Sequence, residues 1–182
     1  MARLEIKKTY KIYIGGKFPR TESGRFYNPK GIDANVCQSS RKDFRNAVVV
    51  ARAVQPSWAG RSAYNRSQIL YRIAEIMEGR RAQFISELEL QGSSKKQAEE
   101  EVNATIDRWV YYAGWCDKYQ QIFSSVNPVA SNHFNFSVLE PMGVVASTAP
   151  EESSLLGIST IIATAIAGGN SLIAIASESK PL

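Results

Sequence analysis

Residues 143–176 read GVVASTAPEESSLLGISTIIATAIAGGNSLIAIA, and this stretch decides the fold class. Residues 143–149 and 172–176 are short apolar runs, which are typical of strands buried on both faces. Residues 153–167 form an apolar helix, and Gly168-Gly169-Asn170 ends it because glycine readily adopts the left-handed conformation. Strand, helix and strand in this order predict one right-handed βαβ unit of a parallel sheet, so the fold class is α/β.

A sheet of two strands would leave both of its edges open and one of its faces poorly covered. The sequence ends at Leu182, just after the second predicted strand. We therefore expect further chain or another subunit to complete this sheet.

The residues before the βαβ unit begin with a short β lead-in. Polar and apolar side chains alternate over residues 10–14 before Gly15-Gly16, which predicts a strand and a turn. Glycine and proline punctuate further extended pieces over residues 24–37. Much later, residues 124–133 form a turn-rich connector, and residues 134–139 alternate in the manner of an extended arm.

Helices are expected between the lead-in and the connector. Ser40 with Asp43, and Ser94 with Gln97, have the spacing of the capping boxes that begin helices. Residues 99–101 are three glutamates, which should stabilise the positive end of the second of these helices. The expected helices cover residues 40–55 (ended by Pro56), 65–78, a short segment around 84–88, and 94 to about 123.

The composition is that of a globular protein. The chain has 182 residues and a mass of 20.1 kDa, with 44% apolar and 21% charged residues. Two cysteines and one histidine exclude a multiply bridged secreted scaffold and an ordinary zinc site, so no metal site is predicted. The N-terminus lacks a signal peptide, and polar residues interrupt the apolar stretch 155–175, so we expect a cytoplasmic protein without membrane spans.

Charge is unevenly distributed along the chain. Residues 1–81 hold 17 Lys and Arg against 6 Asp and Glu, whereas residues 82–182 hold 5 against 11. A basic half with interleaved aromatic residues could bind nucleic acid, which predicts binding that weakens with salt. The alternative is a solvated basic face that meets an acidic face of the same protein, and the lack of a stacking motif or recognition helix favours it.

Open α/β sheets bind their ligands at the carboxyl ends of the strands, here residues 148–152 and Ser177-Glu178. The first turn lacks the G-x-G-x-x-G pattern, and the carboxylates of Glu151-Glu152 would repel a pyrophosphate placed there. Spacing alone therefore gives weak support to dinucleotide binding. Cys116, on an apolar helical stripe, is interpreted as a structural cysteine, and His133 as a histidine of a surface turn.

Several motifs follow one another in a characteristic order. They are Glu140-Pro141-Met142-Gly143-Val144-Val145, Ala167-Gly168-Gly169-Asn170 and Ser177-Glu178-x-x-Pro181-Leu182, preceded by Tyr13-Ile14-Gly15-Gly16-Lys17 and Tyr112-Ala113-Gly114-Trp115. Together they resemble the aldehyde dehydrogenase superfamily, which has E-P-x-G-V-V, A-G-N and K-P-S-E-x-x-P-L motifs. The resemblance covers the chain from about Tyr10 onward and is to a divergent branch of the family.

The resemblance implies a Rossmann-type NAD(P)-binding domain in an oligomeric oxidoreductase that oxidises aldehydes through a cysteine thiohemiacetal. It implies NAD or NADP as cofactor, with Thr148, Ala149 and Pro150 on the nicotinamide side, and Ser177 and Glu178 beside the adenosine ribose. The family's catalytic cysteine and general-base glutamate correspond to positions beyond residue 182. We therefore predict no catalytic residue within this chain.

Two departures from the family pattern keep a second hypothesis open. Where the family has P-W-N, this chain has Pro150-Glu151-Glu152, and an ionised Glu152 cannot donate a hydrogen bond to an oxyanion as asparagine does. Loss of one such donor typically costs about 2.7–4 kcal/mol of transition-state stabilisation. Ile175 replaces the family's ribose-binding lysine. The alternative to an enzyme is therefore a non-catalytic, dehydrogenase-fold assembly partner, with a basic-face nucleic-acid binder as the third hypothesis.

Three segments follow from this interpretation. Residues 1–123 form the N-terminal hairpin and helices of the NAD(P)-binding domain. Residues 124–140 form a connector and arm that is a candidate oligomerisation element, since this arm helps subunits to pair in the resembled family. Residues 141–182 form the first βαβ unit of the NAD(P)-binding core.

Overall fold

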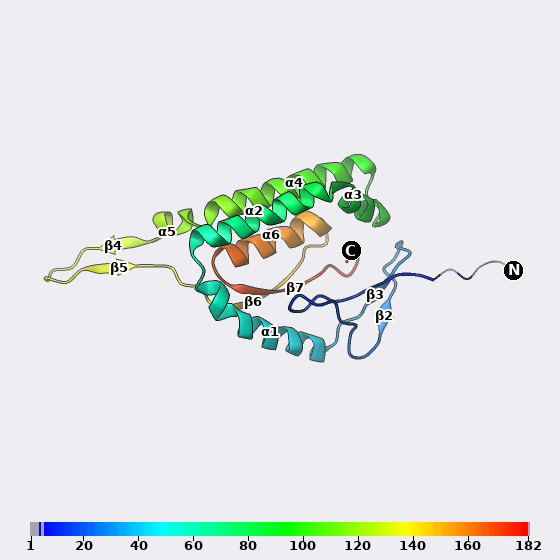
Figure 1. Cartoon of the computed structure of the whole chain (residues 1–182), viewed down its shortest axis with the longest axis horizontal. Coiled ribbons are helices and arrows are strands. Elements are labelled where there is room, and N and C mark those ends of the chain that lie inside the picture. Colours follow the sequence, from blue (N-terminus) through cyan, green and yellow to red (C-terminus); the bar gives the residue numbers. More distant parts are fainter. Residues whose placement is uncertain (1–3, 5, 182) are drawn as a thin grey trace.

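The computed structural model describes residue 4 and residues 6–181. The prediction that the N-terminus lacks a signal peptide therefore falls partly outside the described residues, and Leu182 of the last motif also lies outside them. Three helices pack together above a pair of parallel strands, and a further long helix lies below the strands (Figure 1). A small N-terminal sheet and a projecting hairpin stand at opposite ends of the molecule. The predicted α/β fold class is confirmed.

The βαβ unit has the predicted order. Strand β6 (Val144–Thr148) runs into helix α6 (Ser154–Ala167), and strand β7 (Ser171–Ile175) then pairs in parallel with β6. Gly169 adopts a φ of 84° just after α6, which is the left-handed conformation that favours glycine. The side chain of Asn170 accepts a hydrogen bond of 3.0 Å from the backbone N–H of Gly143, which joins the starts of the two strands.

In the described part of the chain, five helices precede this unit. They are α1 (Arg41–Ala59), α2 (Ala63–Gly79), α3 (Arg81–Leu90), α4 (Lys95–Trp115) and α5 (Lys118–Phe123). Both predicted capping boxes are present, at Ser40 with Asp43 and at Ser94 with Gln97. Burial of Asp43 raises its pKa, but hydrogen bonds from Thr21, Ser40 and the backbone of Glu22 outweigh burial and lower that pKa to about 2.

Two helix boundaries differ from the prediction. Pro56 does not end α1, which continues for three more residues to Ala59. A proline near the end of a helix removes a single backbone hydrogen bond, and Trp58 anchors the extra turn by donating its indole N–H to the carbonyl of Ile166 at 3.0 Å. The expected helix to Phe123 breaks at Cys116, and α5 then places Gln120 where its amide bonds both backbone groups of Leu139.

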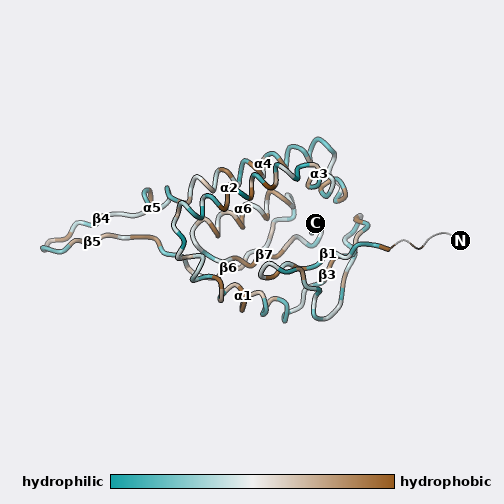
Figure 2. Tube along the Cα trace, viewed as in Figure 1, coloured by the Kyte–Doolittle hydropathy of each residue, from teal (hydrophilic) through white to brown (hydrophobic). Residues whose placement is uncertain are grey.

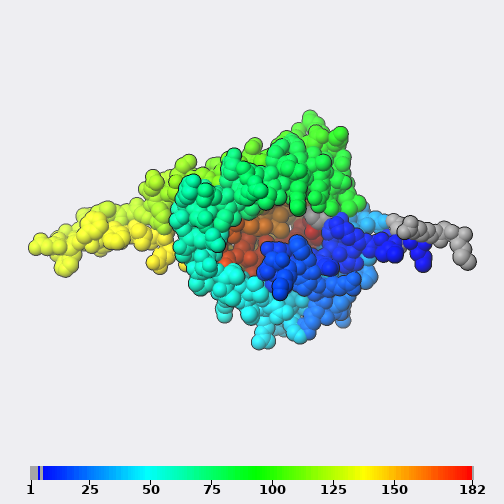
Figure 3. Space-filling view, viewed as in Figure 1, coloured from blue at the N-terminus to red at the C-terminus, as the bar shows by residue number. Residues whose placement is uncertain are grey.

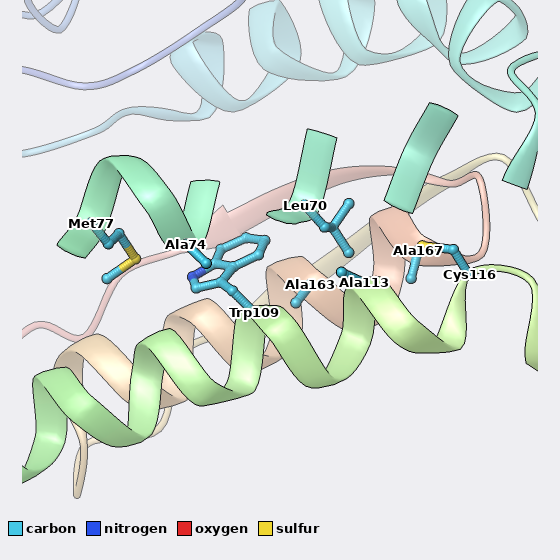
Figure 4. Close-up of a cluster of buried hydrophobic side chains, with 8 residues drawn as sticks. All are labelled: Leu70, Ala74, Met77, Trp109, Ala113, Cys116, Ala163 and Ala167. Atoms are coloured by element: carbon cyan, nitrogen blue, oxygen red, sulfur yellow. The ribbon is translucent and has the colours of Figure 1, made fainter. Parts of the chain in front are cut away.

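The largest cluster of buried side chains lies between α2, α4 and α6. Figure 4 shows Trp109 of α4 between side chains of α2, with the small residues of α6 facing α4. Alanines at these positions let the three helix backbones approach closely, so the helix of the βαβ unit is fixed to the helical layer. The buried members are Leu70, Ala74, Met77, Trp109, Ala113, Cys116, Ala163 and Ala167.

The lead-in forms a sheet of three short strands. Strands β1 (Thr9–Tyr10) and β2 (Phe26–Tyr27) flank β3 (Asn35–Cys37), parallel and antiparallel to it respectively. The strand predicted over residues 10–14 is shorter than expected, and Ile14 instead pairs with Lys17 across the Gly15-Gly16 turn. The predicted arm is strand β5 (Asn135–Ser137), which pairs with β4 (Ser125–Asn127) in a hairpin.

The two-stranded sheet is covered on both faces, which corrects the expectation that one face is poorly covered. Helix α6 lies on one side of β6 and β7, and α1 packs against the other side (Figure 1). The early helix therefore supplies a layer that the local βαβ sequence could not reveal. Within the described residues, no helix is both long and apolar enough to cross a membrane.

Candidate functional site

The carboxyl ends of β6 and β7 meet, and this brings the two halves of the predicted site together. Thr148 lies opposite Ile175 in the parallel register, and the N–H of Ala149 donates to the carbonyl of Ile175 at 2.8 Å. Ala149 is buried, whereas Thr148 and Pro150 are exposed. A crevice at these strand ends is the usual ligand position of an open α/β sheet.

Glu151 joins the two strand ends directly. Its carboxylate accepts hydrogen bonds from the hydroxyl of Ser177 (2.6 Å), from the hydroxyl of Ser179, and from the backbone N–H of Glu178 (3.3 Å). The hydrogen bond from Ser177 is the main reason that the pKa of Glu151 is lowered, and the bond from Ser179 adds to it. Three donors thus converge on one carboxylate at the end of β7.

Ser177 is the buried centre of this arrangement. Only 3% of Ser177 is exposed, and its oxygen also accepts a hydrogen bond of 3.0 Å from the N–H of Lys180. Tyr27 of β2 donates its hydroxyl to the carbonyl of Glu178 at 3.2 Å, so the N-terminal sheet also contacts this turn. Burial, followed by the charges of Glu178 and Glu151, raises the pKa of Tyr27. No local sequence signal marks Tyr27, since 151 residues separate it from Glu178.

The turn after β6 depends on a close contact with α6. A Cβ atom added to Gly157 would lie 2.7 Å from Cδ of Pro150, closer than two carbon atoms can approach. The absent side chain at Gly157 therefore lets Pro150 pack directly on the first turn of the helix. Gly157 thus leaves room for Pro150, which lies two residues after the end of β6.

Glu101 of α4 satisfies the N-terminus of α6. One oxygen of its carboxylate accepts from the N–H groups of Leu155 (3.0 Å) and Leu156 (3.1 Å), and the side chain of Ser153 makes no capping bond. The sequence predicts that the glutamates at 99–101 stabilise α4, but the carboxylate of Glu101 bonds to the start of α6 instead. These amides are the donors that a helix offers to a phosphate, and here a carboxylate of the protein takes them.

The two departures from the family pattern lie on the surface. Glu152 is exposed and Ile175 is 46% exposed, and neither an ionised carboxylate nor an apolar side chain can donate a hydrogen bond to a ligand. Cys116 is fully buried, and burial raises the pKa of its thiol, in agreement with a structural role. His133 is an exposed loop residue beside Ser131, as predicted. In the described part of the chain, no three His, Cys, Asp or Glu side chains could jointly hold a metal ion.

A separate concave surface lies near the other end of β7. A cavity of about 680 Å³ opens between α1, the Gly15 turn and the first half of β7. Figure 3 shows orange and red residues at the bottom of this hollow, between the N-terminal segment and the helices. Its walls include Val50, Val54, Trp58 and Leu172, and none of the predicted site residues contributes to it.

The hydrogen-bond donors at the strand ends and at the start of α6 are occupied by carboxylates of the protein itself. Ser177 and Glu178 follow the end of β7. The amides of α6 are taken by Glu101, and the donors at Ser177–Ser179 are taken by Glu151. A phosphate group therefore finds no open set of donors at either place.

A parallel βαβ unit whose strand ends meet at one edge is characteristic of Rossmann-like folds. The sequence matches the aldehyde dehydrogenase family over residues 20–182. The chain belongs to this family. The resemblance inferred from the motifs is confirmed, together with the place of the chain in the N-terminal region of its relatives.

Relatives and solved structures agree with this assignment. Human retinal dehydrogenase 2 is 32% identical over 98% of this chain and 36% of its own length. Mouse cytosolic 10-formyltetrahydrofolate dehydrogenase is 28% identical over 99% of this chain and 21% of its own length. The NAD⁺ complex of a Bacillus cereus aldehyde dehydrogenase has a TM-score of 0.89 and 27% identity, over 96% of this chain and 37% of that one. The chain thus spans less than two fifths of the length of each.

Proposed function

We propose that the protein to which this chain belongs is an NAD(P)-dependent oxidoreductase of the aldehyde dehydrogenase type that acts on aldehydes. The family match over residues 20–182 is the observation that carries this proposal. The joined carboxyl ends of β6 and β7 support it, because dinucleotides bind at such ends. The nucleophilic cysteine and the general-base glutamate are expected outside residues 1–182.

This chain would contribute binding and orientation rather than bond-making groups. Thr148, Ala149 and Pro150 would line the nicotinamide side, and Ser177 and Glu178 would lie beside the adenosine ribose. The hydrogen bond between Ala149 and Ile175 keeps these two groups of residues adjacent. The cofactor, when bound, would accept the hydride from the aldehyde. The residue ranges 1–123, 124–140 and 141–182 remain our proposed division of the chain.

Binding and turnover test this proposal on the intact protein. Calorimetric titration with NAD and NADP should detect saturable binding, and a panel of aldehydes should reduce the bound cofactor. Ile175→Lys supplies the lysine of the family pattern at a half-exposed position, so it should tighten binding. Val49→Lys, on the exposed side of α1, is the control for an added positive charge. Absence of binding by both the wild type and Ile175→Lys would contradict the proposal.

A second candidate function is a non-catalytic assembly partner with the dehydrogenase fold. The exposed carboxylate of Glu152 and the apolar Ile175 favour it, since neither side chain can donate to an oxyanion or a ribose. Restoring both family residues, as Glu152→Asn and Ile175→Lys, separates the candidates. Turnover already present in the wild type favours the enzyme, whereas turnover that is absent before and after restoration favours the assembly partner.

We also infer that the β4–β5 hairpin pairs subunits in a homo-oligomer. The hairpin projects from the helical layer and carries hydrophobic segments (Figures 1 and 2). Val126, Phe134 and Phe136 are each more than half exposed. Light scattering should give a smaller mass for Phe136→Asp than for Ser131→Asp at the hairpin tip, and equal masses would contradict this inference.

A cytoplasmic location is part of the same proposal. Cys37 and Cys116 are both buried and neither forms a disulfide, which suits a reducing compartment. Fractionation of cells that express the tagged intact protein tests this location.

A further inference from the structure

The turn after β7 forms a small anion-binding site that the protein fills with its own side chain. The hydroxyls of Ser177 and Ser179 and the N–H of Glu178 all point their hydrogens at the carboxylate of Glu151. Two hydroxyls and a backbone amide around one pair of oxygens are the kind of donor set that binds a phosphate monoester.

We propose that Glu151 is a specificity-determining residue, which occupies this anion site and thereby makes the crevice reject a phosphate on the ribose. This inference rests on the proposed function, in which the adenosine ribose lies beside Ser177 and Glu178. NADP differs from NAD by a phosphate monoester on that ribose. With Glu151 in place, such a phosphate would meet a carboxylate instead of three donors, so the protein selects NAD.

The contacts of Glu151 are specific to it and not shared with the next residue. Glu152 carries the same charge and is exposed, but it makes none of the contacts with the turn after β7. The anion site is also firmly built, because Ser177 is almost fully buried and is bonded to the N–H of Lys180. Replacing Glu151 should therefore free a site whose donors keep their positions.

Matched variants and ligands test this inference. Glu151→Gln removes the charge with little change of shape, and Glu152→Gln removes an equal charge that contacts nothing in the turn. Adenosine 2′,5′-bisphosphate and adenosine 5′-monophosphate differ only in the 2′-phosphate. We expect Glu151→Gln to bind the bisphosphate at least about tenfold more tightly than the wild type, with little change for the monophosphate.

The two glutamine variants should behave differently. Glu152→Gln should change the affinity for both ligands by less than about threefold, since it alters only a screened surface charge. The double variant Glu151→Gln with Ser177→Ala should lose the gain in affinity for the bisphosphate, because one of the three donors is removed. Equal effects of Glu151→Gln and Glu152→Gln would overturn the inference, since they would reduce it to general electrostatics.

A second measurement separates this inference from the proposed function. Inorganic phosphate, followed by the backbone amide resonances of Glu178 and Ser179, should saturate in Glu151→Gln and not in the wild type. If phosphate enters Glu151→Gln but no form of the protein binds NAD, the anion site stands and the dinucleotide proposal fails. If the wild type binds NAD while Glu151→Gln takes up no phosphate, the anion-site inference fails alone.

Discussion

Replacing Glu101 by alanine should destabilise the protein through a helix to which Glu101 does not belong. The carboxylate of Glu101 accepts from two N–H groups in the first turn of α6, at 3.0 and 3.1 Å. It acts as the cap that Ser153 does not provide. Loss of a helix cap costs about 0.5–2 kcal/mol, and loss of a carboxylate at the positive end of a helix costs about 0.3–1 kcal/mol.

The expected loss of unfolding free energy is therefore about 1–3 kcal/mol in Glu101→Ala. For a chain of this size, that corresponds to a fall of about 2–12 °C in the unfolding midpoint. Glu101→Gln keeps an oxygen acceptor without the charge, so its loss should be smaller. Urea unfolding followed by circular dichroism measures the free energy, and hydrogen exchange at Leu155 and Leu156 reports the local effect.

Glu100→Ala is the matched control. Glu100 is the exposed neighbour of Glu101, and its described ion pair is a 3.9 Å contact with Lys96 between two exposed side chains. Such a pair contributes about 0.5 kcal/mol or less. If Glu101→Ala and Glu100→Ala unfold at the same urea concentration, or if amide exchange at the start of α6 is unchanged, the capping argument is refuted.

Three further predictions concern buried groups. The pKa of Asp43 is lowered from 3.8 to about 2 in the folded state, so its contribution of about 2 kcal/mol is present above pH 3.8 and is lost as the pH falls toward 2. Acid titration of the unfolding free energy should show this loss in the wild type and not in Asp43→Asn. Gly157→Ala should lower the free energy of unfolding, measured in urea, by about 1–3 kcal/mol, because the added methyl group forces Pro150 away. Gly79→Ala should not lower it in this way, because a Cβ atom at Gly79 would contact no other atom. A thiol reagent followed by mass spectrometry should label Cys116 only after unfolding, and rapid labelling of the native protein would contradict its burial.

Local patterns were enough to predict the elements that local interactions determine. The apolar runs around α6 predicted two strands and a helix, and the spacing of Ser40 with Asp43 predicted the start of α1. Each of these signals lies within a few residues of the structure that it determines. The prediction failed at Pro56 because a contact between Trp58 and Ile166, 108 residues away, supports the turn beyond the proline.

The same distinction explains which parts of the site could be predicted. The positions of Thr148 and Ser177 followed from the rule that parallel strands end at one edge of a sheet. The contacts of Glu101 with α6 and of Tyr27 with Glu178 join residues 54 and 151 positions apart, so no local period marks them. The cover of α1 on the sheet is equally distant in sequence from β7.

The carboxylates near the strand ends have hydrogen-bond partners that their position in the sequence does not reveal. The sequence predicts that Glu151 and Glu152 repel a pyrophosphate placed at this turn. The carboxylate of Glu151 accepts hydrogen bonds from three donors in the turn after β7. The carboxylate of Glu101 likewise accepts from two N–H groups in the first turn of α6. Since each donor set can hold only one anion, a carboxylate that fills it excludes a phosphate by occupancy as well as by repulsion. Exclusion by occupancy predicts that Glu151 and Glu152, which are equal in charge, differ in effect, and the matched glutamine variants measure this difference directly.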